Sequence, residues 1–202
     1  MRGWLHAVAA PISLVAGVVL VVAAPGVRWP LGIYTATLVA MFATSALYHR
    51  GPWSPAGKQV WRRLDHSTIF IFIAGSYTAY CAIALPTARA ATILAVVWVG
   101  ALIGVGLQVF WPTAPRWFSV PSYAALGWVA VFVLPDLLHY GGVLALTMLC
   151  VGGGLYSLGA VAYAIRRPNP FPATFGYHEV FHACVVVAAV CHYAGLWFAL
   201  RF

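Results

Sequence analysis

The sequence predicts an all-α integral membrane protein in which seven transmembrane helices form one bundle. Hydrophobic residues make up 63% of the 202 residues and charged residues only 7%, whereas soluble domains average roughly 45–50% apolar and about 25% charged residues. The only acidic residues are Asp65, Asp136 and Glu179. So few charges cannot cover a water-exposed surface, which excludes a soluble enzyme, a disordered chain and a nucleic-acid-binding module.

Seven apolar stretches are long enough to cross a bilayer, because a spanning helix needs roughly 20 apolar residues. They cover about residues 4–24, 31–49, 64–85, 91–110, 117–134, 141–165 and 176–200. Clusters of proline, glycine and charged residues separate them, and no soluble domain or long linker remains. The first stretch is longer than the usual roughly 7–15 apolar residues of a signal peptide, so we expect it to be retained. We therefore predict a single transmembrane domain over residues 1–202.

The basic residues predict the orientation, because Lys and Arg are enriched in cytoplasmic loops. With a cytosolic N-terminus, eight of them face the cytosol: Arg2, Arg50, Lys58, Arg62, Arg63, Arg116, Arg166 and Arg167. Three face outside: Arg28, Arg89 and Arg201. We therefore expect a cytosolic N-terminus, an outside C-terminus, and cytosolic connections at 50–63, 111–116 and 166–175. The net charge of +8 then reports orientation and does not indicate a nucleic-acid partner.

Five polar residues gather at one predicted membrane face, where ionisable groups are costly and usually functional. His49 ends the second predicted helix, and Ser45 lies one turn deeper on the same face. Asp65 opens the third predicted helix. His178 and His182 lie in the first turns of the seventh, and their i, i+4 spacing places both imidazoles on one face, about 6 Å apart. The predicted topology brings all five to a similar depth near the cytosol.

Three neutral imidazoles with one open position form the ligand set of a catalytic zinc site, and imidazole suits Zn²⁺. This pattern predicts His49, His178 and His182 as zinc ligands. Asp65 is predicted to accept a hydrogen bond from a metal-bound water or to act as a general base. Ser45 is predicted to hold that water or a substrate oxygen. Asp65 and Ser45 are thus the candidate catalytic residues.

Each of these residues also has a simpler structural interpretation. His49 alone suits a helix C-terminus, and Asp65 alone suits an N-cap. His178 and His182 alone suit hydrogen bonds between helices. Because the topology places the five residues together, the combination favours the metal site. Glu179 points about 100° away from His178, so we interpret it as mainly structural, favoured by the helix dipole.

Four further histidines are interpreted separately. His192 lies 14 residues after His178, about 21 Å along the helix axis, which is too far to share one ion. We expect it to be a hydrogen-bonding group in the bundle interior. His6 and His139 are expected near membrane surfaces and are given no role. His66 is a candidate for supporting the metal site, because it follows Asp65 directly.

Two sets of glycines suggest close helix packing. Gly100 and Gly104 form a G-x-x-x-G pattern, for which we expect packing within the bundle in preference to dimerisation. Gly152, Gly153 and Gly154 interrupt the sixth predicted helix and are expected to allow close packing or a kink.

Five spaced motifs carry a resemblance to a known family. They are S-A-L-Y-H at 45–49, L-D-H-S at 64–67, A-G-S-Y-T at 74–78, R-R-P-N-P at 166–170 and F-G-Y-H-E-V-F-H at 175–182. With these motifs the chain resembles, over nearly its whole length, the hemolysin III branch of the progestin and adipoQ receptor (PAQR) family. That family includes the adiponectin receptors and groups with the alkaline ceramidases among membrane hydrolases.

The resemblance implies seven transmembrane helices with a cytosolic N-terminus, in a multi-pass protein of the bacterial plasma membrane. It implies the same zinc ligands as the spacing does, His49, His178 and His182, with Ser45 and Asp65 near the metal. One departure is visible after G-S-Y-T, where many relatives have proline and this chain has Ala79. The third helix is therefore expected to be straighter than in those relatives.

We therefore expect a zinc-dependent hydrolase that cleaves an amide or ester bond of a membrane lipid. A fatty acyl or ceramide-like lipid would lie in a cavity between the helices, and no nucleic acid is expected as a partner. A second interpretation is a sensor or regulator of membrane state, in which structural zinc ties the second and seventh helices together. A third is a cytolysin or channel, as the hemolysin name suggests, although the sequence has no charged pore-lining stripe.

Overall fold

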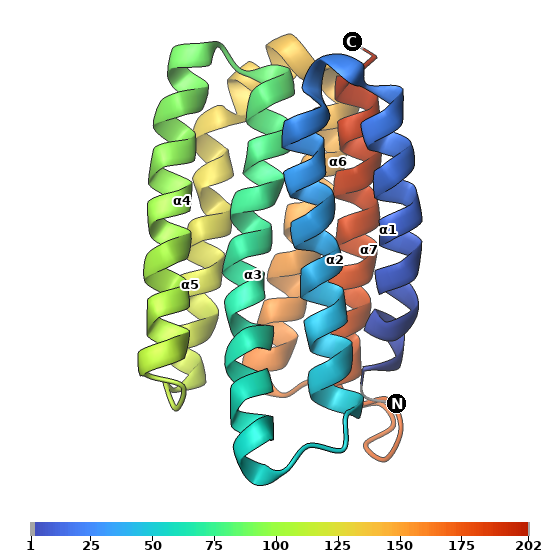
Figure 1. Ribbon diagram of the computed structural model, residues 1–202, viewed down its shortest axis with the longest axis vertical. Helices are drawn as coiled ribbons and strands as arrows, with labels where there is room; N and C mark the ends of the chain where they lie inside the picture. Colours follow the sequence, from blue (N-terminus) through green and yellow to red (C-terminus); the bar gives the residue numbers. More distant parts are fainter. Residues whose placement is uncertain (1–2, 202) are drawn as a thin grey trace.

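The computed structural model describes residues 3–201, and this part of the chain forms a helical bundle (Figure 1). The α-helices are α1 (Trp4–Ala23), α2 (Arg28–Arg50), α3 (Pro55–Ala84), α4 (Thr87–Phe110), α5 (Arg116–Trp128), α6 (Leu134–Ile165) and α7 (Tyr177–Ala199). Two short 3-10 helices, η1 (Pro25–Val27) and η2 (Val129–Val133), link α1 to α2 and α5 to α6. The predicted all-α membrane architecture is confirmed.

Six helical segments of the described chain are long and apolar enough to cross a membrane. One of them, residues 116–165, runs through α5, η2 and α6 and is 50 residues long. Figure 1 shows that it turns at one end of the bundle, so that α5 and α6 run in opposite directions. α5 alone has 13 residues, fewer than the roughly 20 of a typical span. The count of seven crossings therefore stays a prediction.

α3 begins earlier than the sequence analysis placed it. Ser54 is its N-cap, with a side chain that accepts a hydrogen bond from the Gly57 amide at 3.2 Å, and Pro55 occupies the first helical position. Both residue types favour a helix start at these positions. Residues 55–63 are thus helical and not part of a loop. Asp65 lies inside α3, so its expected place at the helix start and its alternative role as an N-cap are both wrong.

The turn between the fifth and sixth predicted crossings also lies elsewhere. Residues 135–141 were expected to form a connection, but they are helical and belong to α6. The helix instead breaks at Gly142, whose φ of +81° is easily adopted only by glycine. Asp136, in the first turn of α6, pairs with the Arg89 guanidinium at 2.9 Å and joins this segment to α4.

Glycines allow the helices to approach closely inside the bundle. A Cβ at Gly104 would clash with the Phe70 ring of α3, and one at Gly100 would lie 2.8 Å from Leu126 of α5. The G-x-x-x-G pattern therefore packs within the chain, as expected. Among the three consecutive glycines of α6, a Cβ would clash with another helix only at Gly152, where it would press on the His192 ring of α7. At Gly153 and Gly154 a Cβ would have nothing within 4 Å.

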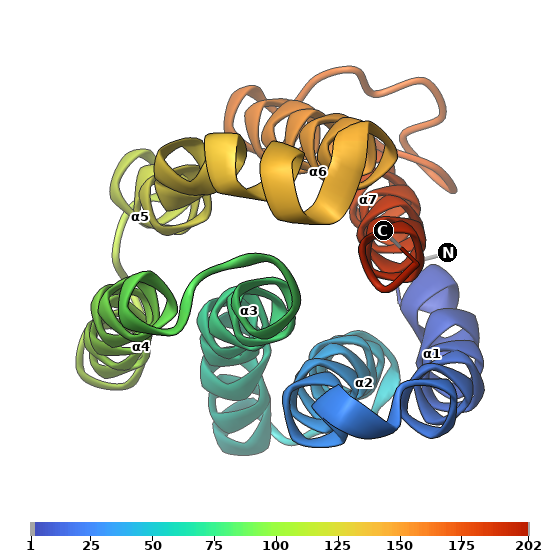
Figure 2. The same cartoon turned by 90° about the horizontal axis from the view of Figure 1, so that it is seen from above.

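The connections of the chain alternate between the two ends of the bundle (Figure 1). Seen from above, the helices follow one another around the bundle in chain order (Figure 2). The links α2–α3, α4–α5 and α6–α7 share one end with the start of α1. Seven described basic residues lie in or next to these links: Arg50, Lys58, Arg62, Arg63, Arg116, Arg166 and Arg167. We call this the basic end. Arg28, Arg89 and Arg201 lie at the opposite end, and Arg2 falls outside the described residues. Which end faces the cytosol stays a prediction.

Candidate metal centre

Two helix ends bring the three predicted histidines together at the basic end. His49 is the last residue but one of α2, and His178 is the second residue of α7, one turn before His182. The start of α7 is fixed by Glu179, whose carboxylate accepts a hydrogen bond from the Gly176 amide at 2.9 Å. This cap agrees with the structural role expected for Glu179 and sets where His178 emerges.

The imidazoles of His49, His178 and His182 form one compact cluster. Their possible ligand atoms all lie within 4.8 Å of one another, and the Nε2 atoms of His49 and His178 are 3.1 Å apart. The ring centroids are separated by 4.5 to 5.1 Å. His182 is buried, and the other two are half-buried.

This spacing fits a shared metal ion. Imidazole nitrogens bind a divalent ion at roughly 2.0–2.1 Å, so two nitrogens in a tetrahedral arrangement lie about 3.3 Å apart. The 3.1 Å between the Nε2 atoms of His49 and His178 is close to this value, and no pair of ligand atoms in the group exceeds 4.8 Å. The three histidines can therefore form a metal site.

Ser45 and Asp65 form a buried polar pair between α2 and α3. Only 3% of Ser45 and 8% of Asp65 is exposed, and a side-chain hydrogen bond joins them. A second contact ties the same helices, since the hydroxyls of Thr44 and Thr68 are 2.9 Å apart. Within the described chain Asp65 is not part of the histidine group, and its role in catalysis stays a prediction.

The His66 imidazole contacts residues outside the group of three histidines. Its Nδ1 lies 2.8 Å from the Arg62 carbonyl oxygen, and its ring lies 6.5 Å from that of Tyr48. Tyr48 in turn packs 4.6 Å from the His49 ring. Tyr48 thus lies between His66 and the histidine group, and the supporting role of His66 stays a prediction.

His6, which received no role from the sequence, belongs to this site. It is 3% exposed, and its ring stacks on His182 with centroids 3.9 Å apart and an interplanar angle of 20°. The predicted alternation of helices already placed the first turn of α1 at the same end as His49, which was the available signal. His139, by contrast, is exposed on α6.

His192 lies away from the metal centre, as expected. It is buried at the α6–α7 contact, and its backbone carbonyl accepts a hydrogen bond from the Tyr80 hydroxyl at 2.8 Å. Neither ring nitrogen makes a hydrogen bond of ordinary geometry to the described part of the chain. The expected hydrogen bond in the bundle interior is thus made clearly by the backbone of His192, while its imidazole makes a weaker contact with the Leu149 backbone.

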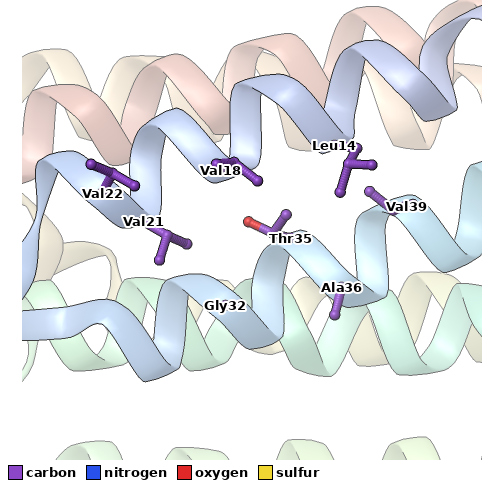
Figure 3. A pocket seen from close by; sticks show the side chains of 8 residues that line it. All are labelled: Leu14, Val18, Val21, Val22, Gly32, Thr35, Ala36 and Val39. Atoms are coloured by element: carbon purple, nitrogen blue, oxygen red, sulfur yellow. The ribbon is translucent and has the colours of Figure 1, made fainter.

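Two cavities differ in character. One of about 360 Å³ adjoins His178 at the basic end, and its lining is Asn169, Pro172, Ala173, Thr174, Gly176, Tyr177, His178 and Glu179. The other, of about 330 Å³, is an apolar groove between α1 and α2 (Figure 3), lined by Leu14, Val18, Val21, Val22, Gly32, Thr35, Ala36 and Val39. The Thr35 hydroxyl donates to the Leu31 carbonyl, so the groove offers mainly apolar contacts.

Comparison with known proteins places the chain in a family. The family described as "Haemolysin-III related" matches residues 1–193. The chain belongs to the haemolysin III-related family. Among its relatives, the Hemolysin-3 homolog of Bacillus subtilis is 27% identical over 186 residues, 90% of this chain and 84% of the relative. Hemolysin-3 of Bacillus cereus is 29% identical over 90% of this chain and 82% of the relative.

Other relatives of the chain carry different names. The heptahelical transmembrane protein ADIPOR2 of Oryza sativa subsp. japonica is 29% identical over 84% of this chain and 81% of its own length. The resemblance to the PAQR and adiponectin receptor group is therefore confirmed. With its apolar spanning helices, this haemolysin III-related chain is a multi-pass integral protein of the plasma membrane.

Proposed function

We propose that this haemolysin III-related protein binds one zinc ion through His49, His178 and His182 and hydrolyses an amide or ester bond of a membrane lipid. The observation that carries the proposal is the convergence of three imidazoles within 4.8 Å in a membrane protein. A buried carboxylate, Asp65 of α3, is bonded to the hydroxyl of Ser45, which lies one turn before His49 on α2.

Zinc suits the donor set. It is commonly bound by three imidazoles at roughly 2.0–2.1 Å in a tetrahedral arrangement that leaves one position open. When bound there, zinc supplies a Lewis acid that polarises a carbonyl oxygen and makes water a better nucleophile. The absence of a nearby cysteine or carboxylate ligand in the described cluster also agrees with an all-imidazole site.

The other polar groups supply proton transfer and orientation. Asp65 accepts the proton of the attacking water, and the Ser45 hydroxyl, bonded to Asp65, holds the carboxylate or a substrate oxygen in place. The cavity beside His178 admits water from the basic end. A fatty acyl or ceramide-like lipid places its apolar chain between the helices, with its carbonyl at the metal centre.

In a second candidate function the same metal ion is structural and catalyses no reaction. The ligands come from the end of α2 and the start of α7, so an ion there would tie together two helices that are distant in sequence. In this case the protein is a sensor or regulator of membrane state with structural zinc. A third candidate, a cytolysin or channel, is favoured by the names of the B. subtilis and B. cereus relatives and by no feature of the site.

Purified protein tested against a panel of lipid amides and esters separates these functions. If the protein is a lipid hydrolase, it should cleave at least one lipid of the panel. A chelator should abolish this cleavage, and added zinc should restore it. His182→Ala should be inactive, and His139→Ala, an exposed histidine of α6, serves as the matched control. If no lipid is cleaved while zinc removal lowers the melting temperature, the sensor is the better function. Solute flux through protein-containing liposomes would favour the channel.

A further inference from the structure

The first turn of α1 lies directly against the candidate metal centre. A Cβ at Gly3 would lie 2.8 Å from the His49 Cβ, and Gly3 has a φ of +78°, which favours glycine. The Trp4 ring packs against the Arg50 guanidinium, 3.6 Å from its centroid. A third helix therefore meets the site that α2 and α7 build.

His6 contacts a second candidate ligand, His182, with its ring. Its imidazole stacks nearly parallel on His182 at 3.9 Å, and the Phe42 ring of α2 lies 4.9 Å from it. His6 is thus enclosed between residues of α2 and α7. Neither of its ring nitrogens makes a hydrogen bond of ordinary geometry to the described residues, and a weaker contact of the imidazole with the His182 backbone accompanies the stacking.

We propose that His6 is a positioning residue of the metal centre, which fixes the orientation of the His182 imidazole by stacking on it. This inference rests on the metal site proposed above. A ligand that is already oriented loses less rotational freedom when it binds the ion, so metal affinity rises. Groups around the ligands of a metal commonly contribute in this way, at roughly 10–100-fold in affinity each.

Stacking and direct coordination by His6 predict different results. The ligand atoms of His6 are not part of the described cluster of His49, His178 and His182, which favours stacking. An aromatic ring without nitrogen should then replace His6, whereas an aliphatic side chain of similar size should not. Phenylalanine and leucine therefore form a matched pair that fills the same space with and without a flat ring.

The experiment measures zinc affinity in detergent by competition with a chelator, together with the absorption spectrum of the cobalt-substituted protein. His6→Leu should bind zinc about 10-fold or more weakly and should alter the cobalt spectrum, which reports ligand geometry. His6→Phe should stay within about threefold of the wild type. His192→Ala, which removes another buried histidine of α7, should match the wild type in both measurements.

Three results would overturn the inference, and they are distinguishable. Wild-type affinity and spectrum in His6→Leu would show that stacking does not position His182. Loss of zinc from both His6→Leu and His6→Phe would show that a ring nitrogen is required, as for a ligand. A wild-type protein that holds no zinc would defeat the metal-site proposal itself, and this inference with it.

Discussion

Asp65 differs from the other two carboxylates of the chain in its surroundings. Asp136 pairs with Arg89, and Glu179 caps the start of α7. Asp65 is buried inside α3 and is joined to the Ser45 hydroxyl. Placing a carboxylate there costs free energy, and neither a helix start nor an arginine pair within the described residues accounts for that cost. The general-base role proposed above would explain why the carboxylate is kept there.

Asp65→Asn tests that role, because asparagine keeps the size of the side chain and can still bond to Ser45 but cannot act as a base. If the protein is a lipid hydrolase, zinc content and melting temperature should stay near wild type, while turnover falls by roughly 10²-fold or more. Turnover is measured on any lipid that the wild type cleaves. Full activity in Asp65→Asn would remove the general base from the mechanism.

The ligand assignment is tested separately by elemental analysis. The wild type should hold about one zinc per chain. His49→Ala and His182→Ala should each lose it, because two imidazoles bind the ion too weakly to survive purification. His192→Ala is the control and should keep its zinc. The opposite pattern, with zinc lost only from His192→Ala, would show that the assignment is wrong.

Much of the site was predictable because its residues repeat at helical spacing or fall at helix ends. His178 and His182 share a face by their i, i+4 spacing, and alternating topology alone brings His49 to the same end. His6 was missed because a single histidine in an apolar helix has no partner in its own sequence. Its role depends on how α1 packs against α7, which the sequence of neither helix specifies.

At the scale of helices, the amino-acid composition located the apolar helices better than it located the residues at which they begin and end. Residues 55–63 are polar enough to suggest a loop, yet the cap at Ser54 starts α3 before them. Residues 135–141 begin with proline, which suggests a turn but also suits the first turn of a helix, and the real break is at Gly142. Local residue types leave both outcomes open, and packing against neighbouring helices decides between them.

The three consecutive glycines of α6 offer a test of helix packing with an internal control. Gly152→Ala should destabilise the protein by about 1–3 kcal/mol, because its Cβ would press on the His192 ring and lie 3.1 Å from the Ala188 carbonyl oxygen. Gly153→Ala meets nothing within 4 Å and should be neutral or stabilising, by up to about 1 kcal/mol. Thermal unfolding in detergent compares them, and equal melting temperatures would contradict the packing.

The basic residues of the molecule are distributed unevenly between the two ends of the bundle. Seven described Lys and Arg residues lie at the basic end and three at the other, and the candidate metal centre lies at the basic end as well. Because cytoplasmic loops carry the excess of positive charge, the metal centre should face the cytosol. Water and any polar product would then exchange with the cytosol through the cavity beside His178.

Cysteine labelling tests this orientation with a membrane-impermeant maleimide. Lys58 and Arg28 are both exposed and lie at opposite ends of the bundle. Arg28 is a better site than Arg89, since replacing Arg89 would break its pair with Asp136. Lys58→Cys should react only in inverted vesicles, and Arg28→Cys only in intact cells. The wild type is the control, because its four cysteines lie within the spanning helices and should not react. The reverse pattern would place the metal centre at the outer face, and hydrolysis would then draw its water from outside the cell.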